Sequence, residues 1–319
     1  MAHLLRSVAV VLAGAWLAGC IAADIPYPQL EGKYASPASR YMTLPDGLRV
    51  HYRDEGPTDA RVVVLVHGFA ASLHAWEPWA ERLQGEYRVL TLDLPGHGLT
   101  RAPADYRMST AGNVAVVDEL TRRVGVERFV VAGNSMGGAV AWSYALAHPE
   151  RVEGLVLVNA AGWPSEARGE GGPAVFKLLA NPAGRVLLRN LDPRPLAARG
   201  LRQAYQDERL VTQALVDRYV ELARAPGHRA LLTSGSGGRS TTPPQSFARI
   251  RTPTLVMVGL KDQVIPPERS RGFVGGIPGS KLVTYAEGGH VPMEQMPEES
   301  ARDLRAFLQA LPPVGLPDS

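Results

Sequence analysis

The sequence predicts an α/β protein: a mostly parallel, twisted sheet with helices on both faces and one helical insertion. Residues 61–66 (RVVVLV) form a continuous run rich in β-branched valine, as in strands that are buried on both faces. Similar runs alternate along the chain with segments of helical periodicity, which is the pattern of successive βαβ units. The 319 residues are 45% apolar and 20% charged, and this composition is typical of a globular protein.

The predicted elements follow one another from residue 41. Strands at 41–44 and 48–53 flank Pro-Asp-Gly, which favours a hairpin. Further strands are predicted at 61–66, 87–92, 128–132 and 154–158, with helices at 75–83, 110–124 and 139–147. After an interruption, strands are predicted at 254–258 and 281–285 and a helix at 297–311.

The interruption, residues 161–248, has helical periodicity broken by glycine and proline, with apolar repeats at 175–180, 185–190 and 210–223. We interpret it as an insertion into one domain whose core is 39–160 and 249–313. The insertion holds 12 basic and 7 acidic residues, or +5, so a net charge of +3 leaves −2 for the rest. Because the overall charge is so small, we expect no nucleic-acid partner.

The N-terminus has the features of an export signal. Residues 1–19 carry Arg6, then an apolar run at 7–18 that is shorter than the roughly 20 residues of a spanning helix. Leu-Ala-Gly-Cys at 17–20 resembles the lipobox of bacterial lipoproteins. The resemblance implies lipid attachment at Cys20, a mature chain of 300 residues (319 − 19), and a place in the bacterial cell envelope, periplasm-facing or at the outer membrane.

The alternative is an ordinary signal peptide cut after Ala23, with Cys20 discarded. Cys20 is the single cysteine of the chain, and it stands at the one position where lipid attachment needs it. Residues 20–38 contain three prolines and no apolar periodicity, and we interpret them as a tether.

A candidate nucleophile lies between a predicted strand and a predicted helix. Residues 133–137 (GNSMG) match G-x-S-x-G, with RFVVA before them and an apolar helical segment after them. In that context the pattern indicates a nucleophile elbow, a strained turn that lifts the serine hydroxyl out of the backbone. Ser135 is therefore the candidate nucleophile.

Serine needs an adjacent base, and the base needs an orienting acid. In folds with this elbow the acid and then the histidine follow the serine along the chain. Of eight histidines, His290 follows the last predicted strand, and Asp262 follows strand 254–258. The other position for the acid, after strand 154–158, holds Asn159, which carries no charge. Asp93 precedes Ser135, and we expect it to fix the turn at 93–98.

Acyl transfer also needs donors for the developing oxyanion. The N–H of Met136, which starts the helix after the nucleophile, is one candidate because the helix dipole favours negative charge there. The N–H of Phe69, in the His67-Gly68-Phe69 loop after strand 61–66, is the second.

Together these motifs resemble the α/β-hydrolase superfamily from about residue 41 to residue 311. The resemblance implies the α/β-hydrolase fold, a catalytic triad of Ser135, Asp262 and His290, and a cap or lid formed by residues 161–248. It does not imply a substrate, because this scaffold serves many chemistries. A serine at 135 argues against haloalkane dehalogenases and epoxide hydrolases, which use aspartate there.

The favoured function is a serine carboxylesterase or lipase that acts on small-molecule esters or lipids through an acyl-enzyme on Ser135. C–C bond hydrolysis of the meta-cleavage-product type and lactone hydrolysis are alternatives. A catalytically silent binding lipoprotein is another. The loop at 69–73 (FAASL) departs from the glycine- and proline-rich loop of C–C hydrolases. No cofactor, cofactor-binding motif or metal site is expected. The sequence alone does not predict an oligomeric state.

Overall fold

The computed structural model describes residues 22–164, 174–234 and 242–313. Its centre is an eight-stranded sheet with the order β1-β2-β4-β3-β5-β6-β7-β8. The strands are β1 (Ser39–Thr43), β2 (Arg49–Glu55), β3 (Val62–Val66), β4 (Arg88–Leu92), β5 (Phe129–Asn134), β6 (Val152–Val158), β7 (Thr254–Gly259) and β8 (Lys281–Tyr285). β2 pairs antiparallel with both of its neighbours, β1 and β4. All pairs from β4 to β8 in the sheet order are parallel.

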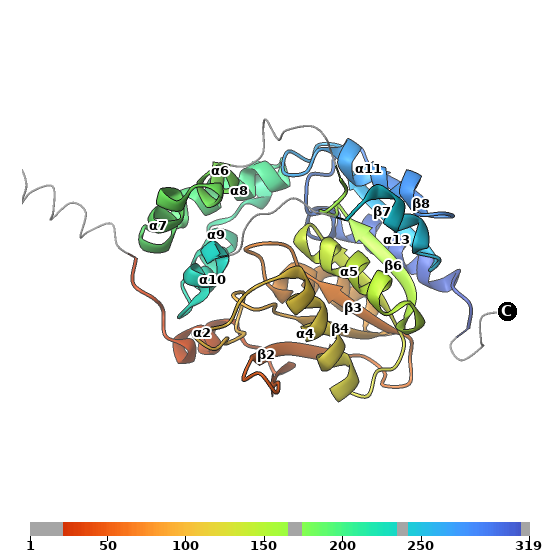
Figure 1. The fold of residues 1–319 in the computed structure, drawn as a ribbon, viewed down its shortest axis with the longest axis horizontal. Coiled ribbons are helices and arrows are strands. Elements are labelled where there is room, and N and C mark those ends of the chain that lie inside the picture. The colour runs from red at the N-terminus through yellow and green to blue at the C-terminus, as the bar shows by residue number, and fades with distance from the viewer. Residues whose placement is uncertain (1–21, 165–173, 235–241, 314–319) are drawn as a thin grey trace, which may run out of the picture.

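Both faces of the sheet are covered, which confirms the predicted α/β class (Figure 1). Alternate residues of β3 point to opposite faces, so Val64 and Val66 pack in one apolar core and Val63 and Leu65 in the other. The first core lies under α4 (Thr110–Arg123), α5 (Met136–Ala147) and α11 (Pro267–Gly276). The second lies under α3 (Glu77–Leu83) and α13 (Pro297–Gln309).

Short helices complete the loops of the core. They are η1 (Leu73–Trp76), η2 (Pro149–Arg151), η4 (Pro244–Arg249) and α12 (Pro292–Gln295). Phe247 of η4 is fully buried and packs against Trp163 and Phe273. Trp163 and Phe247, which the sequence assigns to the insertion, therefore pack with the core.

The inserted helices between β6 and β7 form the cap. They are α6 (Ala174–Ala180), α7 (Pro182–Asn190), α8 (Arg194–Tyr205), η3 (Glu208–Leu210), α9 (Gln213–Ala223) and α10 (His228–Ser234). The sequence does not predict α8, because its Pro195 and Gly200 read as helix breakers. In Figure 1 these green to cyan helices lie to one side of the sheet.

Residues 22–38 differ from the predicted tether, because they carry α2 (Tyr27–Tyr34) and pack on the body. Leu30 is fully buried with Leu99 and Leu222. On the core side, Glu31 accepts hydrogen bonds from Arg49 at 3.0 Å and from Arg101 at 2.7 Å. On the cap side, the Tyr34 hydroxyl donates to Glu221 at 2.8 Å, and Lys33 pairs with the same carboxylate at 2.7 Å.

A buried ion pair joins the cap to the core on another side. Arg218 of α9 lies 3.2 Å from the Glu294 carboxylate of α12 and 3.6 Å from Glu77. The Glu294 side chain is only 7% exposed. Burial raises the pKa of Glu294 to about 7, because desolvation outweighs the favourable charge of Arg218.

Replacement of Leu30 by alanine should lower the free energy of unfolding by about 2–5 kcal/mol, because a fully buried leucine would leave a cavity. Chemical unfolding of the purified protein measures the loss. The exposed neighbour Gln29→Ala is the matched control and should change little. Equal stability of Leu30→Ala and Gln29→Ala would support a free tether.

Glu294→Gln should become more stable relative to the wild type as the pH rises from 5 to 8. The folded-state pKa of Glu294 lies above its unfolded value, so its stabilising proton is fully present below pH about 4.5 and is lost as the pH passes about 7. Glutamine carries no such proton. Urea midpoints at the two pH values test this, with the exposed Glu298→Gln as control. If the stability of Glu294→Gln relative to the wild type fell as the pH rose, the raised pKa of Glu294 would be contradicted.

Candidate active site

Ser135 occupies a strained turn between β5 and α5. Its φ of 54° and ψ of −117° lie in a region that costs a non-glycine residue about 1–3 kcal/mol. The turn is held because the Ser135 N–H donates to Val158 O at 3.1 Å and the Ala161 N–H donates to Ser135 O at 2.9 Å.

Two glycines of the motif make this turn possible. A Cβ at Gly133 would lie 2.1 Å from the carbonyl oxygen of Gly137, and a Cβ at Gly137 would lie 2.0 Å from that of Val66. Side chains at either position would force strand and helix apart. The glycines of G-x-S-x-G thus permit the close strand–helix contact that presents Ser135.

His290 and Asp262 meet beyond the ends of β8 and β7. The His290 Nδ1 lies 2.7 Å from Asp262 Oδ2, and both side chains are buried. The other carboxylate oxygen accepts the N–H groups of Val264 at 2.7 Å and Ile265 at 2.9 Å. Since a carboxylate only accepts, His290 donates through Nδ1, and its Nε2 can act as a base.

Two asparagine carboxamides, not predicted as site residues, position the His290 loop. Asn134 donates to His290 O at 2.9 Å and to Val158 O at 3.1 Å. Asn159 donates to Gly289 O at 2.8 Å, and its own oxygen accepts the Gly259 N–H at 3.0 Å. Asn159, at the alternative sequence position for the acid, thus links the end of β7 to the loop that carries His290.

The loop of Phe69 lies directly against the nucleophile. A Cβ at Gly68 would lie 3.0 Å from the Asn134 side-chain oxygen and 3.2 Å from the Ser135 Cβ. Phe69 and Ser135 line the same cavity, and Met136 opens α5. The assignment of the Phe69 and Met136 N–H groups to the oxyanion stays a prediction.

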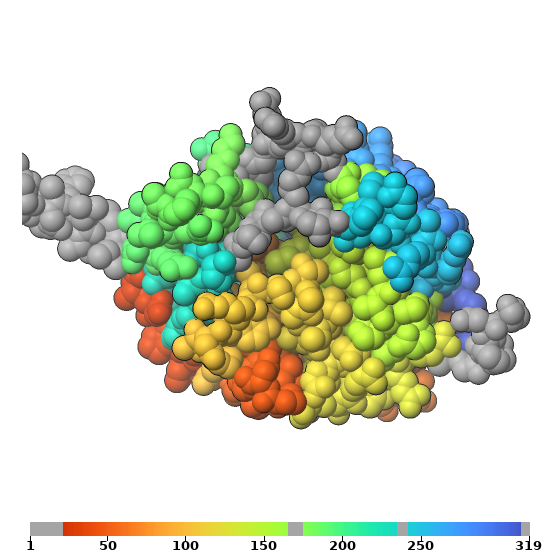
Figure 2. Space-filling model, viewed as in Figure 1, coloured from red at the N-terminus to blue at the C-terminus, as the bar shows by residue number. Residues whose placement is uncertain are grey.

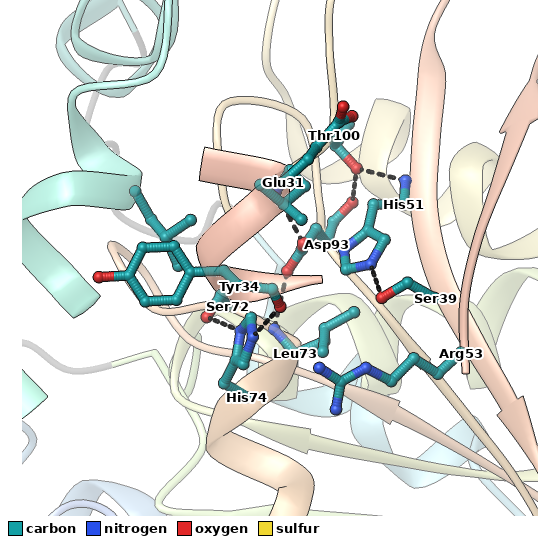
Figure 3. A network of polar contacts seen from close by, with 12 residues as sticks. Glu31, Tyr34, Ser39, His51, Arg53, Ser72, Leu73, His74, Asp93 and Thr100 are labelled. Atoms are coloured by element: carbon teal, nitrogen blue, oxygen red, sulfur yellow. Dashed lines mark hydrogen bonds and ion pairs between the residues drawn. The ribbon is translucent and has the colours of Figure 1, made fainter. Parts of the chain in front are cut away.

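Asp93 fixes the end of the loop that carries Phe69, through a hydrogen bond from the Leu73 N–H (Figure 3). Its carboxylate accepts the N–H of Leu73 and that of Leu99, each at 2.8 Å, and His51 Nδ1 lies 2.6 Å away. Burial alone would raise the pKa of Asp93, but the hydrogen bond and charge of His51 hold it well below its usual range. Asp93 thus stays ionised and joins the turn at 93–98 to the loop after β3.

The His51 ring also contacts Ser39 Oγ at 2.8 Å, so Ser39, His51 and Asp93 are linked through the histidine as the three side chains of a hydrolytic triad are. His51 and Asp93 are fully buried, and none of the three lines the cavity at Ser135. We interpret this network as structural.

Ser135 and His290 open into an apolar cavity of about 210 Å³ between core and cap. Its lining from the cap includes Val175, Phe176, Leu179, Leu188, Leu196, Leu201, Tyr219 and Leu232. Of the apolar cap residues Phe176, Leu178, Leu179, Leu187 and Leu188, the first, third and fifth line it. Leu178 does not, and Leu187 is instead 46% exposed. Arg229 also lines the cavity, and its guanidinium pairs with Asp24 at 2.7 Å.

The structure thus brings Ser135, Asp262, His290 and the Phe69 loop together at one edge of the sheet. The predicted lipid attachment site Cys20 and the signal segment 1–19 lie outside the described residues. Within the described ranges, no three histidine, cysteine or acidic side chains form a group that could hold a metal ion.

Comparison with curated proteins finds relatives with different activities. The chain is 31% identical over 270 residues to a dihydrolipoyllysine-residue acetyltransferase component of an acetoin cleaving system from Cupriavidus necator, covering 83% of this chain and 66% of that protein. It is 28% identical over 281 residues to Lipase 3 of a Moraxella species, with 85% of this chain and 84% of that protein covered. It is 27% identical to a 2-hydroxy-6-oxononadienedioate/2-hydroxy-6-oxononatrienedioate hydrolase of Klebsiella pneumoniae (79% and 89% covered).

Among solved structures, a membrane phospholipase A described as a bacterial virulence factor superposes with a TM-score of 0.73. It is 25% identical, with 97% of this chain and 98% of that chain covered. The family model for the alpha/beta hydrolase fold matches residues 61–297, which is most of the chain and includes Ser135, Asp262 and His290. The chain is therefore a hydrolase of the α/β-hydrolase family.

Proposed function

We propose that the protein is a carboxylic ester hydrolase that works through an acyl-enzyme on Ser135. The observation that carries the proposal is the shared apolar cavity, where the serine of a strained elbow and a histidine already paired with Asp262 face the same space. This arrangement provides a nucleophile, a base and an orienting acid in one place.

In the proposed mechanism Ser135 Oγ attacks the ester carbonyl carbon while His290 Nε2 takes the serine proton. The Phe69 and Met136 N–H groups stabilise the oxyanion, and Asp262 stabilises the imidazolium. Collapse of the tetrahedral intermediate breaks the bond to the alcohol oxygen, which receives the proton from His290. Water, deprotonated by His290, then attacks the acyl-enzyme, and the carboxylic acid and free Ser135 are released.

The lining of the cavity supports a neutral acyl chain as the substrate group. Apart from the triad histidine, the one charged side chain among its described lining residues is Arg229, which already pairs with Asp24. A dicarboxylate of the kind named for the Klebsiella relative would bring negative charge into apolar surroundings, which is costly without free cations. C–C hydrolysis and lactone hydrolysis remain the alternative reactions, because relatives at similar identity include a C–C hydrolase. A silent binding protein is less favoured, because the pairing of His290 with Asp262 is intact.

Wild-type protein should hydrolyse p-nitrophenyl esters and react covalently with a fluorophosphonate probe, whereas Ser135→Ala should lose both by at least about a thousandfold. The control is Ser143→Ala, two turns further along α5, which should keep both activities. The acyl series from acetate to palmitate distinguishes an esterase from a lipase. Full activity of Ser135→Ala, or a wild type that cleaves a vinylogous diketone acid and no ester, would contradict the proposal.

We further propose that the protein is an exported lipoprotein of the cell envelope, anchored through Cys20. Among the described residues, no helix has the length and apolar content needed to cross a bilayer. Two or more acyl chains on one cysteine would give stable membrane attachment, because each buried CH₂ contributes about 0.8 kcal/mol.

Bacteria supplied with an alkyne-bearing fatty acid should label the wild-type protein, and Cys20→Ser should abolish the label. Ser135→Ala is the control for labelling at the active-site serine and should remain labelled. A mature N-terminus at Asp24, found by N-terminal sequencing of an unlabelled protein, would instead support cleavage after Ala23.

A further inference from the structure

The outer face of α7 is apolar where a surface helix is usually polar. Its exposed residues are Pro182, Ala183, Val186, Leu187, Arg189 and Asn190, of which the first four are apolar. Val186 is 61% exposed and Leu187 46%. They are two of the six exposed large apolar side chains in the part of the chain that the structure describes. Such a group on one surface indicates an interaction site.

The chain enters the fold at this same surface. The Ala22 N–H donates to the carbonyl oxygen of Asn190, the last residue of α7, at 3.1 Å. Figure 1 shows the red N-terminal ribbon running from α2 along the cap to α7. A residue spans at most about 3.6 Å, so the Cα atom of Cys20 lies within roughly 7 Å of that of Ala22 in any conformation. A lipid on Cys20 would therefore place the bilayer next to α7.

The charge of the two helices fits an anionic surface. Residues 174–190 contain Lys177, Arg185 and Arg189 and no acidic residue. Lys177 and Arg189 are exposed, and Arg185 is half-buried. Basic side chains near a negatively charged leaflet contribute about 1 kcal/mol each, and apolar side chains beside them enter the headgroup region.

Resting on the proposed lipid anchor at Cys20, we infer that the outer face of α6 and α7 docks on an anionic lipid bilayer surface, with Val186 and Leu187 in contact with lipid. Figure 2 shows these green helices at the outside of the cap, at the end of the molecule where the red N-terminal residues also lie. The opposite sides of the same helices, at Val175, Leu179 and Leu188, line the cavity of Ser135. The docked cap would thus separate the bilayer from the candidate catalytic serine by the thickness of one helix layer.

The test places a tryptophan at the surface and measures its quenching by lipid. Full-length Leu187→Trp is incorporated into vesicles of phosphatidylglycerol and phosphatidylcholine with brominated acyl chains. The matched control is Leu282→Trp, because Leu282 is 41% exposed on β8 at the other end of the molecule. All variants carry Ser135→Ala, so the outcome does not depend on ester hydrolysis.

Docking predicts loss of the added emission of Leu187→Trp and none for Leu282→Trp. Lys177→Glu with Arg185→Glu should restore the emission, whereas Lys281→Glu on β8 should not. Equal quenching at both positions, or none at 187 in anionic vesicles, would overturn the inference. If the emission of Leu187→Trp changed with the amount of protein per vesicle, and not with bromination of the lipid, a second copy of the protein would be covering this face and the inference would be wrong. Retained thermal unfolding temperatures establish that the variants are folded.

Discussion

The backbone of Ser135 is the constraint on which the rest of the site depends. Its positive φ is tolerated because two buried parallel strands and α5 fix the turn from both sides. The same edge of the sheet then receives every other part of the site, because parallel strands end there together. Asn134 and Asn159 extend this rigidity to the His290 loop by bonding its backbone to the strand ends. The strain at one residue is thus supported by hydrogen bonds from β6, β7 and the loop after β8.

The cap supplies what the sheet edge lacks, an apolar wall over the nucleophile. It is held by α2 through Glu221, by α12 through Arg218 and Glu294, and by the contact of His228 with the Thr100 carbonyl oxygen. A further contact joins the two regions directly, because the His290 N–H donates to Ala204 O of α8 at 2.6 Å. The candidate base therefore rests on the cap as well as on the core, and movement of α8 would disturb the position of His290.

The sheet and the elbow could be predicted because each leaves a local pattern, and the pairing of Asp262 with His290 could be predicted from the chain order of folds with this elbow. Continuous runs rich in β-branched residues indicate strands buried on both faces, and G-x-S-x-G has meaning once a strand precedes it and a helix follows. The remaining features depend on contacts distant in sequence. α2 has one buried residue, Leu30, and so shows no apolar periodicity. Asn159, at the end of β6, bonds to residues 259 and 289, which are 100 and 130 residues away in sequence. No local sequence pattern predicts such long-range contacts.

The N-terminal segment also has a consequence for the order of folding. Its cap partners lie far along the chain: Lys33 and Glu221 are 188 residues apart, and Asp24 and Arg229 are 205 residues apart. A chain that emerges from its N-terminus cannot form these contacts until most of the protein has been synthesised. The cap-side contacts of residues 22–34 therefore close later than the core-side contacts of Glu31 with Arg49 and Arg101, which lie only 18 and 70 residues away.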